Sequence, residues 1–222
     1  MVANPLIDKI ASRRGRGMTS QRARDRLGQR LRAQGISDEA VLEAMAATPR
    51  HLFIDEALAS RAYDDTALPI GFGQTISQPY VVALMTAVLN RGATGRVLEI
   101  GTGCGYQTAI LAQIAERVYS IERIGALLDG ARTRVRSLGF SNVVFRGGDG
   151  YAGWRDAAPF DAILVAAAPT EIPENLVDQL ADGGRMILPV GTEGQQQLRL
   201  LSRQGGNITD EVLVPVSFVP LV

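Results

Sequence analysis

The 222-residue chain has a single cysteine, Cys104, and a single histidine, His51. These two residues are too few for a zinc site of His and Cys ligands, and we expect no metal. One thiol cannot form a disulfide within the chain, which is typical of a reducing compartment, so we expect a cytoplasmic protein. A Ser-His-Asp or Cys-His mechanism would have to use His51, whose TPRHLF context is more typical of a helix end.

Lysine is almost absent. Lys9 is the only one, and the other 22 of the 23 basic residues are arginines. A Schiff-base mechanism would therefore have to use Lys9. Basic and acidic residues are equal in number, so the formal net charge is zero, whereas proteins that bind polyanions usually carry a basic excess. We therefore expect no nucleic-acid partner.

Long apolar runs are also missing. No segment is apolar over the length that spans a membrane, and the amino terminus has no run of signal-peptide length, so we expect no membrane association. Residues 1–17, rich in arginine and glycine, are predicted to be a flexible basic extension. Residues 18–222 are predicted to form one domain, with helices and a substrate loop in 18–90 and a sheet core in 91–222. Nothing in the sequence indicates an oligomeric state.

The first part of the chain has helical and loop-like patterns without the alternation of a strand. Leucines at helical spacing predict a helix over 20–34, ended by Gly35. Ser37 is the predicted N-cap of a second helix, which runs to Ala47 and stops near Pro49. This region therefore predicts a helical segment ahead of the core.

From residue 96 short apolar runs alternate with helical segments. Such runs are typical of strands buried on both faces. The predicted strands are RVLEI (96–100), RVYSIE (117–122), NVVFR (142–146), FDAILVAAA (160–168) and RMILPV (185–190). The alternation predicts an α/β fold with a doubly wound, mostly parallel, Rossmann-like sheet.

Further elements complete the predicted core. Helices are expected over 125–138 and from Pro173 to Gly183 and Gly184. Two strands on either side of RQGGN (203–207) are expected to pair antiparallel at an edge of the sheet.

A glycine turn follows the first of these strands. Gly101, Gly103 and Gly105 form a G-x-G-x-G pattern that lets a ligand approach the backbone closely. Dinucleotide folds use G-x-G-x-x-G, and here the later position is Tyr106, whose ring would crowd a pyrophosphate. The turn therefore favours a ligand without phosphates, such as S-adenosylmethionine, over the dinucleotide of an NAD-dependent oxidoreductase.

Two acidic residues occupy the ends of the next two strands. Glu122 lies about 20 residues after Gly101, the offset of a carboxylate that accepts hydrogen bonds from ribose hydroxyls. Asp149, between glycines in GGDG, could accept from the adenine amino group. With the glycine turn, these residues describe an adenosyl pocket.

S-adenosylmethionine is a methyl donor, and the residues after the fourth strand limit which chemical group could accept the methyl. Ala166, Ala167, Ala168 and Pro169 offer no amide or carboxylate to hold an amino group, which argues against methylation of a base nitrogen. They also offer no general base. An acceptor that is already anionic would need none.

The loop PIGFGQTISQPY, residues 69–80, precedes an apolar helical run. Ser77 is its predicted N-cap, with Pro79 in the first turn. Gln74, Thr75 and Gln78 add more polar groups than one cap requires. Their side chains and the loop N–H groups could hold a carboxylate.

Several segments resemble bacterial protein-L-isoaspartate O-methyltransferases, from about residue 18 to the end. They are YDDTALPIGFGQTISQPYVVALMTAVL (63–89), RVLEIGTGCGYQTAILAQIAERVYSIERI (96–124), GDG (148–150), APFDAILVAAAP (158–169), GGRMILPVG (183–191) and FVPL (218–221). The resemblance implies a class I methyltransferase fold with S-adenosyl-L-methionine as donor and S-adenosyl-L-homocysteine as product. It implies isoaspartyl residues of damaged proteins and peptides as acceptors, methylated for repair through a succinimide. A small carboxylate acceptor and a non-catalytic adenosyl-binding module are the alternatives.

The resemblance and the strand-end pattern together indicate the site residues. Ser77 is implied as the catalytic residue, and Thr75, Ser77 and Gln78 as acceptor-binding residues. The expected donor-binding residues are Gln74, Thr75, Ile76, Ser77, Glu99, Gly101, Thr102, Gly103, Gly105, Glu122, Arg123, Asp149 and Gly150. Cys104 and Ala166 stand where serine and threonine are more usual, and either could remove a polar contact to the donor.

Overall fold

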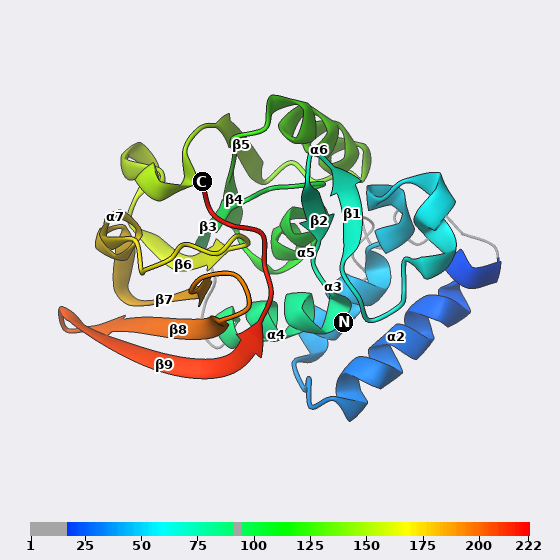
Figure 1. Ribbon diagram of the computed structural model, residues 1–222, viewed down its shortest axis with the longest axis horizontal. Helices are drawn as coiled ribbons and strands as arrows, with labels where there is room; N and C mark the ends of the chain where they lie inside the picture. Colours follow the sequence, from blue (N-terminus) through cyan, green and yellow to red (C-terminus); the bar gives the residue numbers. More distant parts are fainter. Residues whose placement is uncertain (1–16, 91–94) are drawn as a thin grey trace.

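A seven-stranded sheet lies at the centre of the molecule, with helices on both faces (Figure 1). The structure is a computed structural model that describes residues 17–90 and 95–222. The predicted extension lies outside the described residues except for Gly17, so its flexibility stays a prediction. The strands of the sheet are β3 (Arg96–Ile100), β4 (Arg117–Glu122), β5 (Val143–Gly147), β6 (Phe160–Val165), β7 (Leu180–Val190), β8 (Gln196–Gln204) and β9 (Asn207–Val216).

The strand order is β5-β4-β3-β6-β7-β8-β9. The first five of these strands pair in parallel, and β8 and β9 add an antiparallel edge. The chain therefore moves outward from β3 to β5 and then returns to β6 on the other side of β3. Ligand crevices form at the carboxyl ends of strands where the order reverses in this way. The predicted doubly wound sheet with an antiparallel edge is confirmed.

Helices pack in two layers against this sheet. The α-helices are α2 (Gln21–Ala33), α3 (Glu39–Ala47), α4 (Pro79–Leu89), α5 (Tyr106–Ile114), α6 (Gly125–Ser137) and α7 (Glu174–Asp178). Short 3₁₀ helices are η1 (Gly17–Thr19), η2 (Arg50–Phe53), η3 (Glu56–Arg61), η4 (Gly150–Ala152) and η5 (Arg155–Ala157). One apolar core lies between the helices α2, α3, α4, α5 and α6 and one face of the sheet. A smaller core lies between α7, η5 and the other face.

The central strands are mostly apolar because both faces of the sheet are covered. Val97, Leu98 and Ile100 of β3 are at most 1% exposed, as are Ile163 and Val165 of β6. Burying a side chain of this size contributes about 1.5–3 kcal/mol. This packing holds the carboxyl ends of β3 and β6 rigidly beside each other.

Two predicted helix ends differ from the structure. Asp38, not Ser37, is the N-cap of α3, and its carboxylate accepts a hydrogen bond from Val41 N–H at 3.1 Å. The helix expected from Pro173 ends at Asp178, and Gly183 and Gly184 lie inside β7. Glycines often end helices, but here both lie at an irregularity of β7, between the Phe160–Leu180 pair and the regular pairing with β6 and β8 that begins at Arg185.

A β-hairpin precedes α4 in a region where the sequence predicts only helices and loops. Its strands, β1 (Leu68–Gly71) and β2 (Gln74–Ile76), pair antiparallel and form a separate two-stranded sheet. They are too short to show an alternating pattern. In Figure 1 this hairpin lies near the centre of the view, above α5.

The last residues of the chain return across the carboxyl end of β6. Ala168 N–H donates to the Val219 carbonyl and Leu221 N–H donates to the Ala168 carbonyl, both at 2.8 Å. Gln196 binds both backbone groups of Phe218, at 2.6 and 3.0 Å. Figure 1 shows this segment in red, crossing in front of the sheet. These bonds bring the carboxyl terminus to the ligand end of the sheet.

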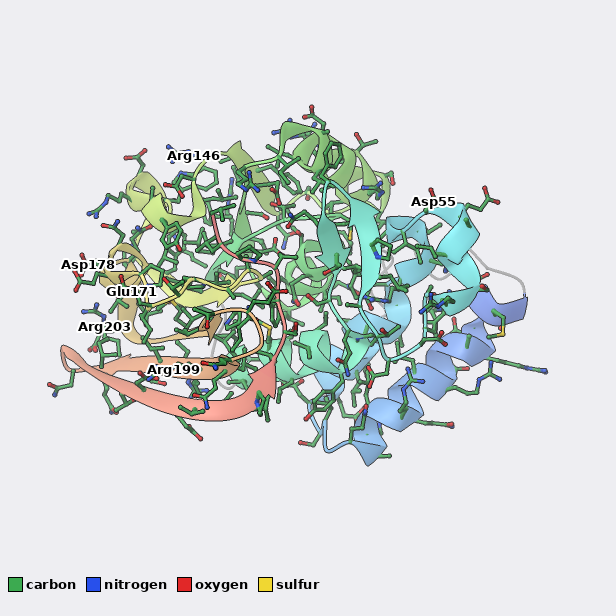
Figure 2. All side chains as sticks on the ribbon, viewed as in Figure 1. Asp55, Arg146, Glu171, Asp178, Arg199 and Arg203 are labelled. Atoms are coloured by element: carbon green, nitrogen blue, oxygen red, sulfur yellow. The ribbon has the colours of Figure 1, made fainter. Side chains whose placement is uncertain are left out.

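Charged side chains extend from the outer elements. Figure 2 labels Asp55 on the helical side, and Arg146, Glu171, Asp178, Arg199 and Arg203 on the opposite side of the molecule. Among the described residues no helix is long and apolar enough to cross a membrane.

Candidate active site

A cavity opens at the carboxyl ends of β3, β4, β5 and β6. It encloses about 780 Å³ between atoms, part of it open to solvent. The residues expected for the donor that line it are Gln74, Thr75, Ile76, Ser77, Gly101, Thr102, Gly103, Glu122, Arg123 and Gly150. We call it the donor cavity. Glu99, Gly105 and Asp149 are not among its lining residues.

The glycine turn forms one wall of the donor cavity. Gly101, Gly103 and Gly105 have φ of +90°, +55° and +90°, values that side-chain-bearing residues rarely adopt. Gly105 is buried, and a Cβ there would lie 3.1 Å from Ala131 Cβ of α6. Gly105 therefore lets α5 and α6 approach closely, whereas Gly101 and Gly103 face the cavity.

Glu122 joins the end of β4 to the glycine turn. Its carboxylate accepts hydrogen bonds from Gly103 N–H and Ile124 N–H, both at 2.9 Å, and the residue is 7% exposed. A carboxylate has about four acceptor positions, so Glu122 retains two for a ligand hydroxyl pair. Its position in the cavity fits the expected ribose contact.

Glu99 lies behind the turn instead of in the cavity. Its Oε2 accepts hydrogen bonds from Thr108 at 2.6 Å and Ser120 at 2.5 Å, and Ser120 in turn bonds the Thr102 hydroxyl at 2.6 Å. Full burial raises the pKa of Glu99 to about 7, although both hydroxyl donors oppose this shift. The carboxyl group therefore supports the turn from the core.

Asp149 is exposed, and its side chain accepts a hydrogen bond from Tyr151 N–H at 2.8 Å. Its neighbours Gly148 and Gly150 line the donor cavity. A Cβ at Gly150 would lie 2.5 Å from Ile100 Cγ2, so only glycine lets this backbone pack against β3. The backbone on either side of Asp149 thus reaches the cavity more directly than its carboxylate.

The hairpin forms the opposite wall. The segment from Gln74 to Ser77 lines the donor cavity, and Ile70 lies against the glycine turn, 3.4 Å from where a Cβ of Gly103 would be. Phe72 at the hairpin tip has φ of +54° and is 64% exposed. A bulky residue in this conformation is uncommon, and such strain is often found near functional sites.

Ser77 is not the N-cap of α4, so that prediction is wrong. The helix begins at Pro79 after Gln78, and Asp65 accepts the hydrogen bond from Tyr80 N–H at 3.0 Å. The Ser77 hydroxyl makes no hydrogen bond to any described residue. Because Asp65 caps the helix, the hydroxyl is left available for a ligand.

A second cavity lies between the segment before the hairpin and the end of β9. It encloses about 860 Å³, part of it open to solvent, and includes Gln78 with all residues from Pro215 to Val219. Four residues line both cavities: Thr75, Ser77, Ala166 and Val219. We call it the acceptor cavity. Ser77 therefore lies where the two cavities meet.

The carboxyl-terminal segment is a part of the site that sequence reasoning missed. Val219, Pro220, Leu221 and Val222 line the donor cavity. They carry no polar side chain that would indicate a ligand contact. The FVPL motif was the only available signal, and its position over β6 depends on backbone hydrogen bonds that a sequence does not show.

The lining of the donor cavity fits an adenosyl group. Ile100, Ile121 and Leu221 give apolar surface suited to a flat base, while Glu122 offers acceptors for a vicinal diol. Closely approaching glycine backbone leaves room for a chain that continues toward Ser77. No phosphate-binding side chain is needed for such a ligand.

Comparison with known proteins agrees with this geometry. The family model for protein-L-isoaspartate(D-aspartate) O-methyltransferase (PCMT) matches residues 22–222. A protein-L-isoaspartate O-methyltransferase of Halorhodospira halophila is 57% identical over 209 residues, which cover 94% of this chain and 95% of the relative. One from Alcanivorax borkumensis is 58% identical over 207 residues, covering 93% and 94%.

Two solved structures share the fold over most of the chain. A protein-L-isoaspartate O-methyltransferase superposes with a TM-score of 0.81 at 30% identity, covering 89% of this chain, which spans 65% of that longer protein. A Plasmodium falciparum beta-aspartate methyltransferase (PCMT), solved with S-adenosyl-L-homocysteine, gives 0.78 at 28% identity and covers 88% and 96%.

Proposed function

This chain belongs to the protein-L-isoaspartate(D-aspartate) O-methyltransferase family, and on this premise we propose that Ser77 orients the acceptor carboxylate at the junction of two ligand cavities. The protein is a repair enzyme that moves a methyl group from S-adenosyl-L-methionine to the free α-carboxylate of L-isoaspartyl residues. The methyl ester starts conversion to aspartyl through a succinimide. The observation that carries the proposal is that Ser77 lines both cavities.

The donor is proposed to bind with its ribose on Glu122. Its adenine then lies on the apolar surface formed by Ile100, Ile121 and Leu221, beside the backbone of Gly148 and Gly150. The methionyl part extends in the other direction, toward the glycine turn and the hairpin. This orientation uses the Glu122 carboxylate and the apolar surface next to it.

The acceptor is proposed to enter through the acceptor cavity. Thr75, Ser77 and Gln78 offer two hydroxyls and an amide on its hairpin side, and the backbone of 215–219 forms the other side. An extended peptide fits between two such walls because its backbone can pair with theirs. Its carboxylate would then reach Ser77.

The chemistry requires alignment more than acid–base catalysis. An α-carboxylate has a pKa of about 3.5, so the acceptor is ionised at neutral pH and no base is needed. Bound S-adenosylmethionine supplies a methyl group on a positively charged sulfur. Ser77 donates a hydrogen bond to one carboxylate oxygen and leaves the other free to attack in line. The reacting atoms must be held about 3–3.5 Å apart, which is the work of the two cavity walls.

Charge is neutralised in this step, so water would stabilise the reactants more than the transition state. The hairpin on one side and residues 219–222 on the other cover the junction and would reduce contact with water. We further place the enzyme in the cytoplasm, where one buried free thiol at Cys104 is stable.

A matched pair of peptides tests the acceptor. The two peptides share one sequence and differ only in having isoaspartyl or aspartyl at one position. We expect base-labile methyl incorporation into the isoaspartyl peptide alone. Equal methylation of both peptides, or stronger methylation of a small carboxylic acid, would contradict the assignment.

A further inference from the structure

Arg50, the first residue of η2, is fully buried, with 0% of its surface exposed. Its Nε, Nη1 and Nη2 atoms make no hydrogen bond with any of the described residues. Arg50 also forms no ion pair with the described acidic residues. The guanidinium is therefore a buried cation without a counter-charge in the described parts of the chain.

Such an arrangement is unfavourable by itself. Burial lowers the pKa of Arg50, but a guanidinium remains charged in proteins. Removing a cation from water without pairing it carries a large free-energy cost. The ring of Tyr106, whose centroid lies 4.9 Å from the Arg50 Cζ atom, offsets part of this cost through a cation–π contact. A bound anion would offset more.

The nearest neighbours of Arg50 connect it to the donor cavity. Tyr106 is the first residue of α5 and lines that cavity, as does Cys104. Burial raises the pKa of the Cys104 thiol, and the nearby charge of Arg50 opposes this shift. The positive charge thus lies directly behind the wall formed by the end of the glycine turn. The free N–H groups at the start of α5 add positive potential to the same wall.

The two substrates offer two anions. The acceptor cavity includes neither Cys104 nor Tyr106, so the acceptor carboxylate is remote from Arg50. The donor carries a carboxylate on its methionyl part. In the proposed orientation that part lies against the glycine turn, on the side away from Glu122.

We propose that Arg50 is a buried positioning cation that attracts the methionyl carboxylate of the donor through the Cys104–Tyr106 wall. This inference rests on the proposed donor site. It assigns Arg50 an electrostatic role in donor affinity without direct contact, because a shell of neutral side chains separates it from the cavity. The field acts strongly across that shell because the interior screens charge poorly.

Arg24 provides a matched control. It is also buried, at 1% exposure; its Nε and Nη1 atoms make no hydrogen bond with a described residue, whereas Nη2 donates to the Gln21 side-chain oxygen. Its charge acts on His51 and Tyr63, which do not line the donor cavity. Replacing Arg24 therefore removes a buried cation from the same helical layer without changing the wall behind the donor.

The test compares two ligands by titration calorimetry. They are S-adenosyl-L-homocysteine and its decarboxylated analogue S-adenosyl-3-thiopropylamine, which keeps the ammonium group. In Arg50→Met we expect the affinity for the first to fall 10- to 100-fold and that for the second to fall less than threefold. Arg24→Met should change both affinities by the same factor. Equal weakening of both ligands in Arg50→Met, or an unchanged affinity for S-adenosyl-L-homocysteine, would overturn the proposal.

Arg50→Lys extends the test if Arg50→Met does not fold. Burial lowers the pKa of a lysine far enough for it to lose its charge near neutral pH. In this variant the affinity for S-adenosyl-L-homocysteine, relative to wild type, should fall between pH 6.5 and 8.5, while that for the analogue should not. If the ratio of variant to wild-type affinity for S-adenosyl-L-homocysteine is below one but does not change with pH, Arg50 has a merely structural role. The donor site itself is tested separately: wild type must bind S-adenosyl-L-homocysteine, and Glu122→Ala must weaken it.

Discussion

The carboxylate of Asp65 accepts a hydrogen bond from Tyr80 N–H at 3.0 Å, and so caps α4 from a position 15 residues earlier in the chain. Gln78, at the N-cap position, makes no capping hydrogen bond with its side chain, and Ser77 lies one residue further from the helix. The same Asp65 carboxylate accepts a hydrogen bond from Gln34 of the loop after α2, at 2.9 Å. A single side chain thus ties the helical layer to the segment that carries Ser77.

Removing this cap should affect both stability and catalysis. Asp65→Ala should lower the free energy of unfolding by about 0.5–2 kcal/mol, the range for a lost N-cap. It should also lower kcat, because Ser77 can then turn toward the uncapped helix. Denaturant unfolding and methylation of an isoaspartyl peptide measure the two effects. Asp65→Asn retains an acceptor oxygen and should lie between wild type and Asp65→Ala; the reverse order would contradict the capping argument.

Ser77→Ala tests the catalytic assignment directly. We expect kcat to fall on the order of 10- to 10³-fold, by comparison with the loss of one positioning donor at an active site. Donor affinity and unfolding midpoint should change little, because the hydroxyl makes no hydrogen bond within the described parts of the chain. Ser141→Ala, at an exposed position, is the control for a serine substitution. Wild-type turnover in Ser77→Ala would remove Ser77 from the mechanism.

Glu122→Ala should weaken donor binding. A hydrogen bond to a charged group contributes about 1.5–3 kcal/mol, so the Kd for S-adenosyl-L-homocysteine should rise on the order of 10- to 100-fold. Asp149→Ala should raise it less, because the Asp149 carboxylate is exposed and bonded to Tyr151 N–H. Titration calorimetry measures the Kd for S-adenosyl-L-homocysteine in both variants. An effect at Asp149 as large as that at Glu122 would favour a direct contact from Asp149 to the adenine.

Glu99 should make stability depend on pH. Its pKa is raised from about 4.5 to about 7 in the folded protein, so the folded state holds a proton that the unfolded state has lost. Stability should therefore fall as pH rises from about 4.5 to 7, by on the order of 3 kcal/mol at 1.36 kcal/mol per unit. Glu99→Gln carries no charge and should remove this slope. Urea midpoints between pH 4.5 and 8 measure it, and equal slopes in both proteins would show that Glu99 ionises normally.

Gly105→Ala tests the packing behind the glycine turn. A left-handed backbone costs an alanine about 1–2 kcal/mol, and a new Cβ 3.1 Å from Ala131 adds overpacking of similar size. We expect a loss of about 2–4 kcal/mol in chemical denaturation. Gly183 also has positive φ, but a Cβ there meets open space, so Gly183→Ala should lose only the backbone part. Similar losses in both variants would mean that α5 and α6 are not in close contact.

The sequence predicted the parallel core well because its signals are local. Buried parallel strands need apolar residues on both faces, so RVLEI and RVYSIE indicate β3 and β4 without knowledge of their neighbours. The glycines after β3 likewise indicate a turn from the local sequence alone, and the structure shows them at positive φ. The relation of this turn to Glu122 follows from the offset between consecutive strand ends in a parallel sheet.

Only the tertiary structure separated the roles of the two glutamates. Both lie near strand ends, but the Glu99 side chain is fully buried and accepts a hydrogen bond from Ser120 of β4, whereas Glu122 ends β4 and accepts one from Gly103 N–H of the glycine turn. Likewise, the cap from Asp65, the hairpin and the position of residues 219–222 depend on contacts between segments distant in the chain. Local pattern determines which elements form, whereas the directions of individual side chains depend on how those elements pack.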